Sequence, residues 1–148
     1  MGRYFEELQV GECYESPRRT ITEADLTIFA GFSGDYNPMH TDEEFAKATP
    51  FKTRILHGPA GLAIATGLES RLGLKDGTAL AMLGLTWEFQ APVKVHDTIR
   101  VVERVKAKRE TSKPDRGIVT FAVEVVNQDG VVCQSGDWKV MMKRRPPA

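Results

Sequence analysis

The sequence of 148 residues has little cysteine and no excess of charge of either sign. Its two cysteines, Cys13 and Cys133, lie far apart without metal-ligand spacing, which favours a reducing, cytoplasmic environment. Twenty basic residues balance twenty acidic ones, so the bulk charge gives no sign of nucleic-acid or membrane binding. No apolar run is long enough to cross a bilayer, and the first residues lack the apolar core of a signal peptide. We therefore expect a cytoplasmic protein without a nucleic-acid or membrane partner.

The chain also lacks internal repeats, low-complexity tracts and linkers, which predicts one domain over residues 1–148. Its first half carries helix signals. A capping box at Thr22 predicts a helix that ends at Gly34, and a second box at Thr41 predicts a short helix that Pro50 stops. Residues 59–72 are apolar on nearly every side and are bounded by Pro59 and a glycine, which predicts a buried helix.

The second half is rich in valine, isoleucine, threonine and aromatic residues, and in places these alternate with polar ones. This pattern predicts strands over 80–89, 98–108, 117–127 and 131–143. The stretch NQDGV, which begins at Asn127, is a hairpin turn signal. Strands joined by short turns form an antiparallel sheet, and the buried helix must lie across it. The predicted fold class is therefore α+β.

The stretch SGDYNPMH, which begins at Ser33, places an acid and an imidazole five positions apart. Pro38 disfavours helix at Asn37, so residues 35–40 are predicted to form an ordered loop on which Asp35 and His40 can converge. Alternatively, the Asp and Asn side chains only stabilise a turn, and His40 is a surface residue.

The wider pattern favours a functional role. The stretch reads G-D-x-N-P-x-H, and the histidine of LHGP follows seventeen residues after His40. Five such coincidences at one start arise by chance on the order of once in a few million. This pattern resembles the hydratase motif of the MaoC-like family of (R)-specific enoyl-CoA hydratases and dehydratases. The segment FQAPVKVHDTIRV, which begins at Phe89, resembles another segment of the family. The resemblance implies a hotdog fold, in which an antiparallel sheet wraps around the helix at 59–72.

The resemblance also implies roles for individual residues. Asp35 and His40 would be the catalytic pair that adds water to one face of a 2-enoyl thioester, and the Gly58 N–H would bind the thioester oxygen. Asn37 would order the loop or orient water. From its position in the sequence, His57 is either a packing residue under the loop or a polar wall of the site, and we favour packing. No metal is expected, because the three histidines and two cysteines show no ligand spacing. No redox cofactor is expected either, since coenzyme A enters as part of the substrate, and the resemblance implies a homodimer.

Other residues are candidates for substrate contact. The apolar candidates for the acyl pocket are Phe32, Tyr36, Met39, Phe51, Met82 and Trp87. Two groups of cations are either CoA-phosphate contacts or solvated faces: Lys106, Lys108, Arg109, Lys113 and Arg116, and Lys143, Arg144 and Arg145.

Three positions depart from the family pattern. Pro59 lacks an N–H, Ala63 stands where many hydratases have a serine, and His96 replaces a turn glycine. Two alternatives therefore stay open: a non-catalytic acyl-CoA-binding subunit, or a thioesterase. A thioesterase would need a carboxylate on the central helix, and residues 59–67 contain none.

Overall fold

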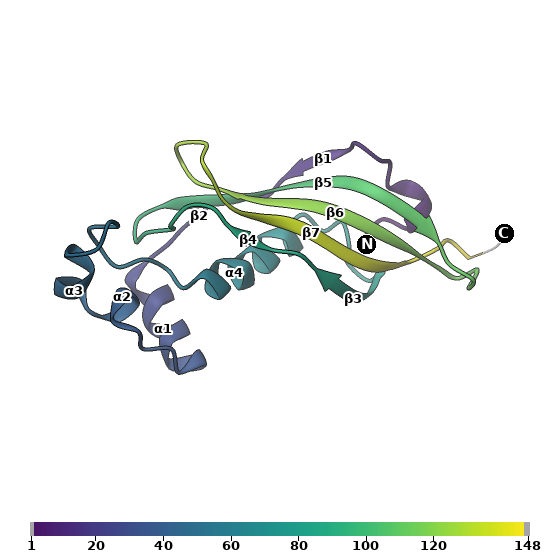
Figure 1. The fold of residues 1–148 in the computed structure, drawn as a ribbon. Coiled ribbons are helices and arrows are strands. Elements are labelled where there is room, and N and C mark those ends of the chain that lie inside the picture. Colours follow the sequence, from purple (N-terminus) through teal and green to yellow (C-terminus); the bar gives the residue numbers. More distant parts are fainter. Residues whose placement is uncertain (1, 147–148) are drawn as a thin grey trace.

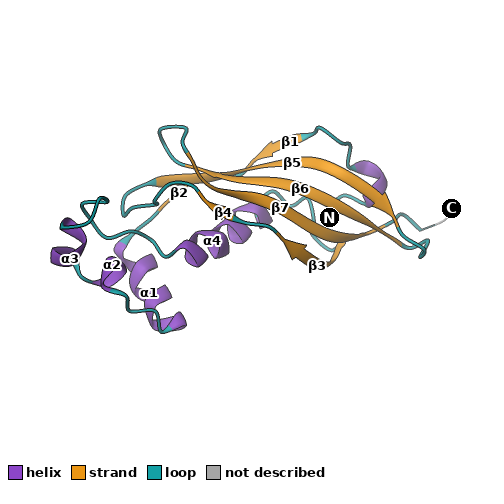
Figure 2. Cartoon of the chain, viewed as in Figure 1, coloured by secondary structure: helices purple, strands orange, loops and turns teal. Residues whose placement is uncertain are grey.

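An antiparallel sheet curves over one long helix in the computed structural model, which describes residues 2–146 (Figures 1 and 2). The helices are α1 (Glu23–Ser33), α2 (Pro38–Thr41), α3 (Glu43–Lys47) and α4 (Gly58–Ser70), with a 3-10 turn η1 at Phe5–Glu7. The strands are β1 (Cys13–Glu15), β2 (Arg19–Thr20), β3 (Ala79–Leu85), β4 (Glu88–Phe89), β5 (Thr98–Glu110), β6 (Arg116–Val126) and β7 (Val132–Lys143).

The strands are ordered β1-β5-β6-β7-β3 across the sheet, and all pairs are antiparallel. The two short strands extend its edges, because β2 pairs with β5 beyond β1, and β4 pairs with β7 beyond β3. The predicted hairpin joins β6 to β7, and Gly130 takes the positive φ of 78° that its turn requires. Strands β1 and β2 were not predicted, because segments of three and two residues show no periodicity.

The core lies between the sheet and α4. The alternation predicted along β6 is confirmed, since Val119, Phe121, Val123 and Val125 are all buried. The prediction that residues 59–72 are buried on all sides is wrong for the single chain. Ala60, Gly61, Ala65, Leu68 and Glu69 are buried against the sheet, whereas Ala63, Thr66, Gly67 and Ser70 are exposed on the opposite face. Only one side of α4 contacts the sheet.

The helix predicted after Thr22 is confirmed as α1. The Asp25 carboxylate accepts a hydrogen bond from the Thr22 N–H at 2.8 Å, and Gly34 ends the helix with φ 76°. The cap predicted for the next helix is wrong by one residue. The Asp42 carboxylate, not Thr41, accepts the Phe45 N–H at 3.0 Å at the start of α3.

The predicted loop at 35–40 is also shorter than expected. Asn37 caps a single helical turn, α2, in which Pro38 is the first residue and His40 the third. Proline disfavours helix in the residue before it but is well suited to the first helical position, so the turn begins at Pro38 itself.

The strand predicted over 80–89 is divided into β3 and β4. The division lies where the chain crosses Gly136 of β7, because a Cβ on this glycine would lie 1.8 Å from the Thr86 carbonyl oxygen. Beyond this crossing, β4 pairs with β7 and places the Phe89 ring against Gly58 at the start of α4.

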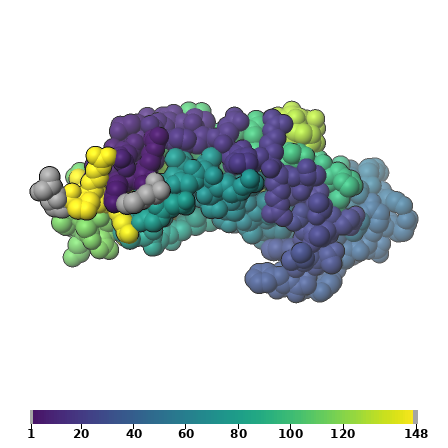
Figure 3. All heavy atoms as spheres, turned by 180° about the vertical axis from the view of Figure 1, so that it is seen from behind, coloured from purple at the N-terminus to yellow at the C-terminus, as the bar shows by residue number. Residues whose placement is uncertain are grey.

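Helices α1–α3 form an arm (residues 23–47) that projects beyond one end of the sheet (Figures 1 and 3). The arm is joined to the body by Arg54, which forms ion pairs with Glu23 of α1 and Glu43 of α3 at 2.6 and 2.7 Å. The motif at 33–40 lies in this arm. Within residues 2–146, no helix is long and apolar enough to span a membrane.

Candidate active site

The loop that carries Asp35 is held by its own side chains. The Asp35 N–H donates to the Ser33 hydroxyl, and one Asp35 carboxylate oxygen accepts the Asn37 N–H, both at 3.1 Å. The Asn37 side chain in turn accepts the Met39 N–H at 3.1 Å. These bonds are the ones expected if the Asp35 and Asn37 side chains stabilise a turn. They leave the second Asp35 carboxylate oxygen free, so the structural and functional roles are compatible.

The His40 side chain is half-buried on α2 and is oriented by the backbone. Its Nδ1 lies 2.7 Å from the Ile55 carbonyl oxygen. A carbonyl oxygen can only accept a hydrogen bond, so Nδ1 carries the proton in this contact. In the neutral ring, Nε2 is then the nitrogen with a free lone pair, and this nitrogen can exchange a proton with a ligand.

His57 lies directly beneath both residues and is 1% exposed. Its ring stacks on the His40 ring with centroids 3.9 Å apart and contacts Phe29 at 4.9 Å. Its Nε2 lies 2.9 Å from the Asp35 carbonyl oxygen, to which it donates. The predicted packing role is confirmed, and the hydrogen bond adds a second role that the sequence did not indicate.

The three residues converge on one point. Asp35, His40 and His57 each offer a carboxylate oxygen or ring nitrogen, and these atoms lie within 4.8 Å of one another. A water molecule that is hydrogen-bonded to two groups lies about 2.8 Å from each, so one water can bridge atoms at this separation. The same donor set could also hold a cation.

A cleft of about 470 Å³ opens beside His40. It is lined by Phe51, Ile55, Leu56, Gly58, Pro59, Phe89, Gln90, Ala91, Pro92, Val93 and Gln134 as well as His40. Gly58 is the first residue of α4, where backbone N–H groups lack partners within the helix and attract anionic oxygens. A Cβ on Gly58 would lie 2.7 Å from the Phe89 ring, so only glycine lets this ring reach the start of the helix.

The predicted substrate contacts are spread over different environments. Phe51 lines the cleft, whereas Trp87 packs behind it against Trp138 with ring centroids 5.8 Å apart. Asn37 caps α2, and Tyr36 is 64% exposed on the loop. Contact of these four residues with a substrate stays a prediction. Gln134, which the sequence did not single out, is buried and lines the cleft.

The three residues that depart from the family pattern lie in different parts of the structure. Pro59 lines the cleft, but Ala63 lies in a separate groove between α1 and α4. His96 is exposed and has φ 74°, which explains why a glycine suits this turn. The carboxylate of α4 is Glu69, near the opposite end of the helix from Gly58, where it is buried and paired with Lys75 at 2.7 Å. It is therefore not available to a ligand in the cleft.

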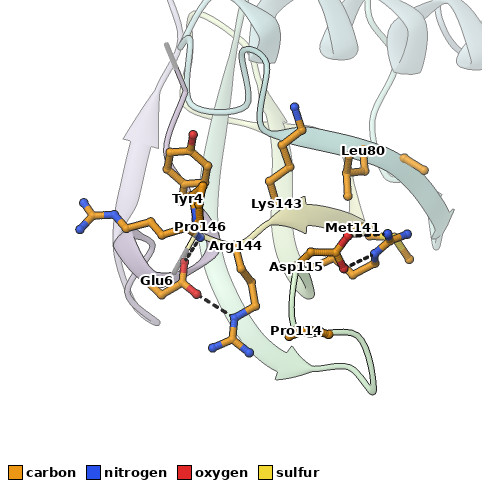
Figure 4. Close-up of a pocket in the computed structure, with 12 residues that line it drawn as sticks. Tyr4, Glu6, Leu80, Pro114, Asp115, Met141, Lys143, Arg144 and Pro146 are labelled. Atoms are coloured by element: carbon orange, nitrogen blue, oxygen red, sulfur yellow. Dashed lines mark hydrogen bonds and ion pairs between the residues drawn. The ribbon is translucent and has the colours of Figure 1, made fainter. Parts of the chain in front are cut away.

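A second cavity of about 920 Å³ lies at the far end of the sheet, near the C-terminus (Figure 4). Four of the cations considered for CoA line it, and the three arginines among them pair with carboxylates. Arg144 pairs with Glu6 and Arg116 with Asp115, both at 2.7 Å. Within one chain, these ion pairs favour the interpretation of the cations as a solvated face.

Comparison with known proteins connects this geometry to a family. Residues 6–127 match the family described as MaoC like domain. An (R)-specific enoyl-CoA hydratase from Rhodospirillum rubrum is 35% identical over 144 residues, which cover 96% of this chain and 93% of the relative.

Solved structures agree with the architecture. A protein from Archaeoglobus described as a monoamine oxidase regulatory protein is 34% identical, with a TM-score of 0.91 over 98% of this chain and 97% of that one. A Mycobacterium tuberculosis protein described as having a double hotdog fold is 18% identical, with a TM-score of 0.83 over 99% of this chain and 46% of that one. The predicted hotdog architecture is thereby confirmed.

Proposed function

The chain belongs to the MaoC-like domain family, and on this basis we propose that it is an (R)-specific enoyl-CoA hydratase that also catalyses the reverse dehydration of a 3-hydroxyacyl-CoA. The observation that carries the proposal is the convergence of Asp35 and His40 within 4.8 Å at the mouth of a mainly apolar cleft. As a hydro-lyase, it needs a base for water, an acid for the α-carbon and donors for the thioester oxygen.

The catalytic pair would share one water molecule. One member takes a proton from the water as its oxygen bonds to C3 of the substrate. The electrons of the double bond move toward the thioester oxygen, and a proton then reaches C2. Because the two proton-transferring groups lie within 4.8 Å of one another and share one water molecule, water and proton add to the same face of the double bond. The His40 Nε2 and the free Asp35 oxygen are the atoms available for these transfers.

The developing negative charge needs a fixed partner. The Gly58 N–H at the start of α4 supports this role, because the helix dipole and the unpaired backbone donor both favour an anionic oxygen there. The thioester oxygen held at Gly58 would also determine which face of the double bond meets the water.

Hydration of a trans-2-enoyl-CoA is expected to produce only the (R)-3-hydroxyacyl-CoA. Loss of the enoyl thioester absorbance measures turnover, and separate coupling to (R)- and (S)-specific dehydrogenases identifies the product. A product that only the (S)-specific enzyme oxidises would contradict the proposed geometry. No turnover with any chain length would instead favour a non-catalytic acyl-CoA-binding subunit.

We also propose that the reaction needs no metal or redox cofactor. Each histidine contacts a backbone carbonyl through one ring nitrogen and keeps the other available, so Asp35, His40 and His57 together could hold a cation. The proposed proton transfers use only the two side chains and the Gly58 N–H, however, and no step calls for a Lewis acid. Treatment with EDTA during the same assay should leave turnover unchanged. The proposed setting is the cytoplasm, in keeping with the sparse, unpaired cysteines.

A homodimer is the proposed assembly, with β3 as the contact. All seven residues of this edge strand are exposed, and Leu80, Met82, Leu83 and Leu85 are each 41–46% exposed. An apolar edge strand with free backbone groups invites pairing with another chain, and a second copy would also cover the apolar rim of the cleft near Phe89.

Leu83→Lys is expected to shift the protein from dimer to monomer, because it places a charge in the middle of the proposed contact. Light scattering at micromolar concentration measures the change. Val131→Lys is the matched control, because Val131 is equally exposed at 44% but lies on the β6–β7 hairpin. A 16.5 kDa monomer for the unmodified protein would refute the assembly.

A further inference from the structure

Gln134 is a buried polar residue of the cleft whose orientation is fixed by a neighbour. It lies on β7 directly opposite Phe89 of β4 and is 3% exposed. Its side-chain oxygen Oε1 accepts the Trp87 indole N–H at 3.0 Å. An indole nitrogen can only donate, so the amide oxygen must face Trp87 and the amide nitrogen must face the other way.

The amide nitrogen points at the first turns of α4. A Cβ built on Gly61 would lie 2.2 Å from Gln134 Nε2, so the absence of a side chain at Gly61 makes room for this amide. Gln134 lines the same cleft as His40 and Gly58. Among the residues described, 2–146, Nε2 has no hydrogen-bond acceptor, and it is not sealed from solvent, so it is reachable from the cleft. A donor that faces the cleft without a protein partner is available to a ligand.

The start of α4 has few donors of its own. Pro59 has no N–H, and the N–H groups of Ala60 and Gly61 both donate to the His57 carbonyl oxygen, at 3.0 and 3.2 Å. Gly58 therefore provides the one backbone N–H of this turn that is free to bind a substrate oxygen. Gly61 lies one turn further along the same face, so the Gln134 amide lies about 5 Å along the helix from Gly58.

We propose that Gln134 Nε2–H is the second donor to the thioester oxygen of the substrate, beside the Gly58 N–H. This inference rests on the proposed hydratase function. When the water oxygen bonds to C3, the double-bond electrons move to the thioester oxygen, which then carries negative charge until C2 receives its proton. Two donors stabilise this oxygen better than one, and the Gln134 amide replaces the N–H that Pro59 lacks. Trp87 is a positioning residue that keeps the amide nitrogen toward the cleft.

The test compares Gln134→Met, Trp87→Phe and the double variant. Methionine has the length of glutamine but no donor, so Gln134→Met should lower kcat by about 10²-fold. Trp87→Phe removes the indole N–H and so allows the Gln134 amide group to flip; it should lower kcat less. The double variant leaves no indole N–H unpaired, so it should unfold at a higher temperature than Gln134→Met while its kcat stays equally low. Gln9→Met, on the exposed N-terminal segment, is the control for the substitution itself.

Binding of unreactive analogues separates a contact with the thioester oxygen from a general loss of fit. The unmodified protein should bind a saturated acyl-CoA thioester better than the matching S-alkyl thioether, which lacks the carbonyl oxygen. In Gln134→Met the ratio of thioester affinity to thioether affinity should fall by about tenfold, with the affinity for the thioether unchanged. Unchanged kcat in Gln134→Met, or an unchanged thioester preference, would overturn the inference. Lack of turnover by the unmodified enzyme would instead refute the proposed function, and the binding comparison would still test the Gln134 contact.

Discussion

Asp35→Asn and His40→Asn are each expected to lower turnover of a trans-2-enoyl-CoA by about 10²–10⁴-fold, the usual effect of losing an acid or base. Both substitutions retain the local hydrogen bonds. Asparagine at position 35 still has an oxygen to accept the Asn37 N–H, and asparagine at position 40 places a donor near the Ile55 carbonyl, where Nδ1 lies now. The loss should therefore be in kcat, with the melting temperature little changed.

The controls are the same substitutions away from the cleft. Asp129→Asn changes an exposed hairpin residue, and His96→Asn changes an exposed residue with φ 74°, a conformation that asparagine tolerates well. Both should turn over substrate at the unmodified rate. Near-normal turnover in either the Asp35 or the His40 variant would rule out the proposed pair.

The second large effect concerns stability and arises from a buried ionic cluster between α4 and the sheet. Lys75 pairs with Glu69 of α4 and with Glu103 of β5, and its ammonium lies 3.9 Å from the centroid of the Phe121 ring. Glu103 is fully buried. One of its carboxylate oxygens has no hydrogen-bond partner among residues 2–146. Two carboxylates thus share a single cation in the core.

Lys75→Met is expected to lower the free energy of unfolding by about 3–5 kcal/mol, because it leaves two buried carboxylates without a counter-charge. This is a large part of the total stability of a typical domain, about 5–15 kcal/mol. Denaturant unfolding at pH 8 measures the effect. Lys47→Met is the control, because Lys47 pairs with Glu44 on the surface of α3, where an ion pair contributes little. A loss below about 1 kcal/mol for Lys75→Met would show that the cluster does not hold the helix to the sheet.

The same cluster predicts a pH dependence of stability. Burial raises the pKa of Glu103 from its usual 4.5 to about 7, although the Lys75 charge opposes this shift. The folded protein therefore retains a proton that the unfolded chain has already released, and stability falls as the pH rises from about 4.5 through 7. The contribution of Glu103 is about 3 kcal/mol over this range. Glu103→Gln, which cannot titrate, should flatten the curve of unfolding free energy against pH.

The amino-acid sequence by itself determined the features that depend on neighbouring residues. The cap at Thr22, the left-handed end of α1 at Gly34 and the hairpin after Asn127 each rest on contacts within a few positions. The alternation in β6 likewise reports one buried face directly. The sequence also determined the candidate pair, because Asp35 and His40 lie on one short segment whose proline and glycine limit its conformations.

Only the tertiary structure decided which distant groups meet. His57 reaches the Asp35 carbonyl across 22 positions, and the interior face of β7 brings Gln134 against α4 and Trp87. The sequence has no local signal for either contact, because the residues next to a buried histidine or glutamine in the sequence are the same whichever distant group its side chain contacts. Sheet register and the crossing at Gly136 select these partners. The catalytic pair can therefore be read from the chain, whereas the groups that hold it and complete the cleft depend on how the sheet closes over the helix.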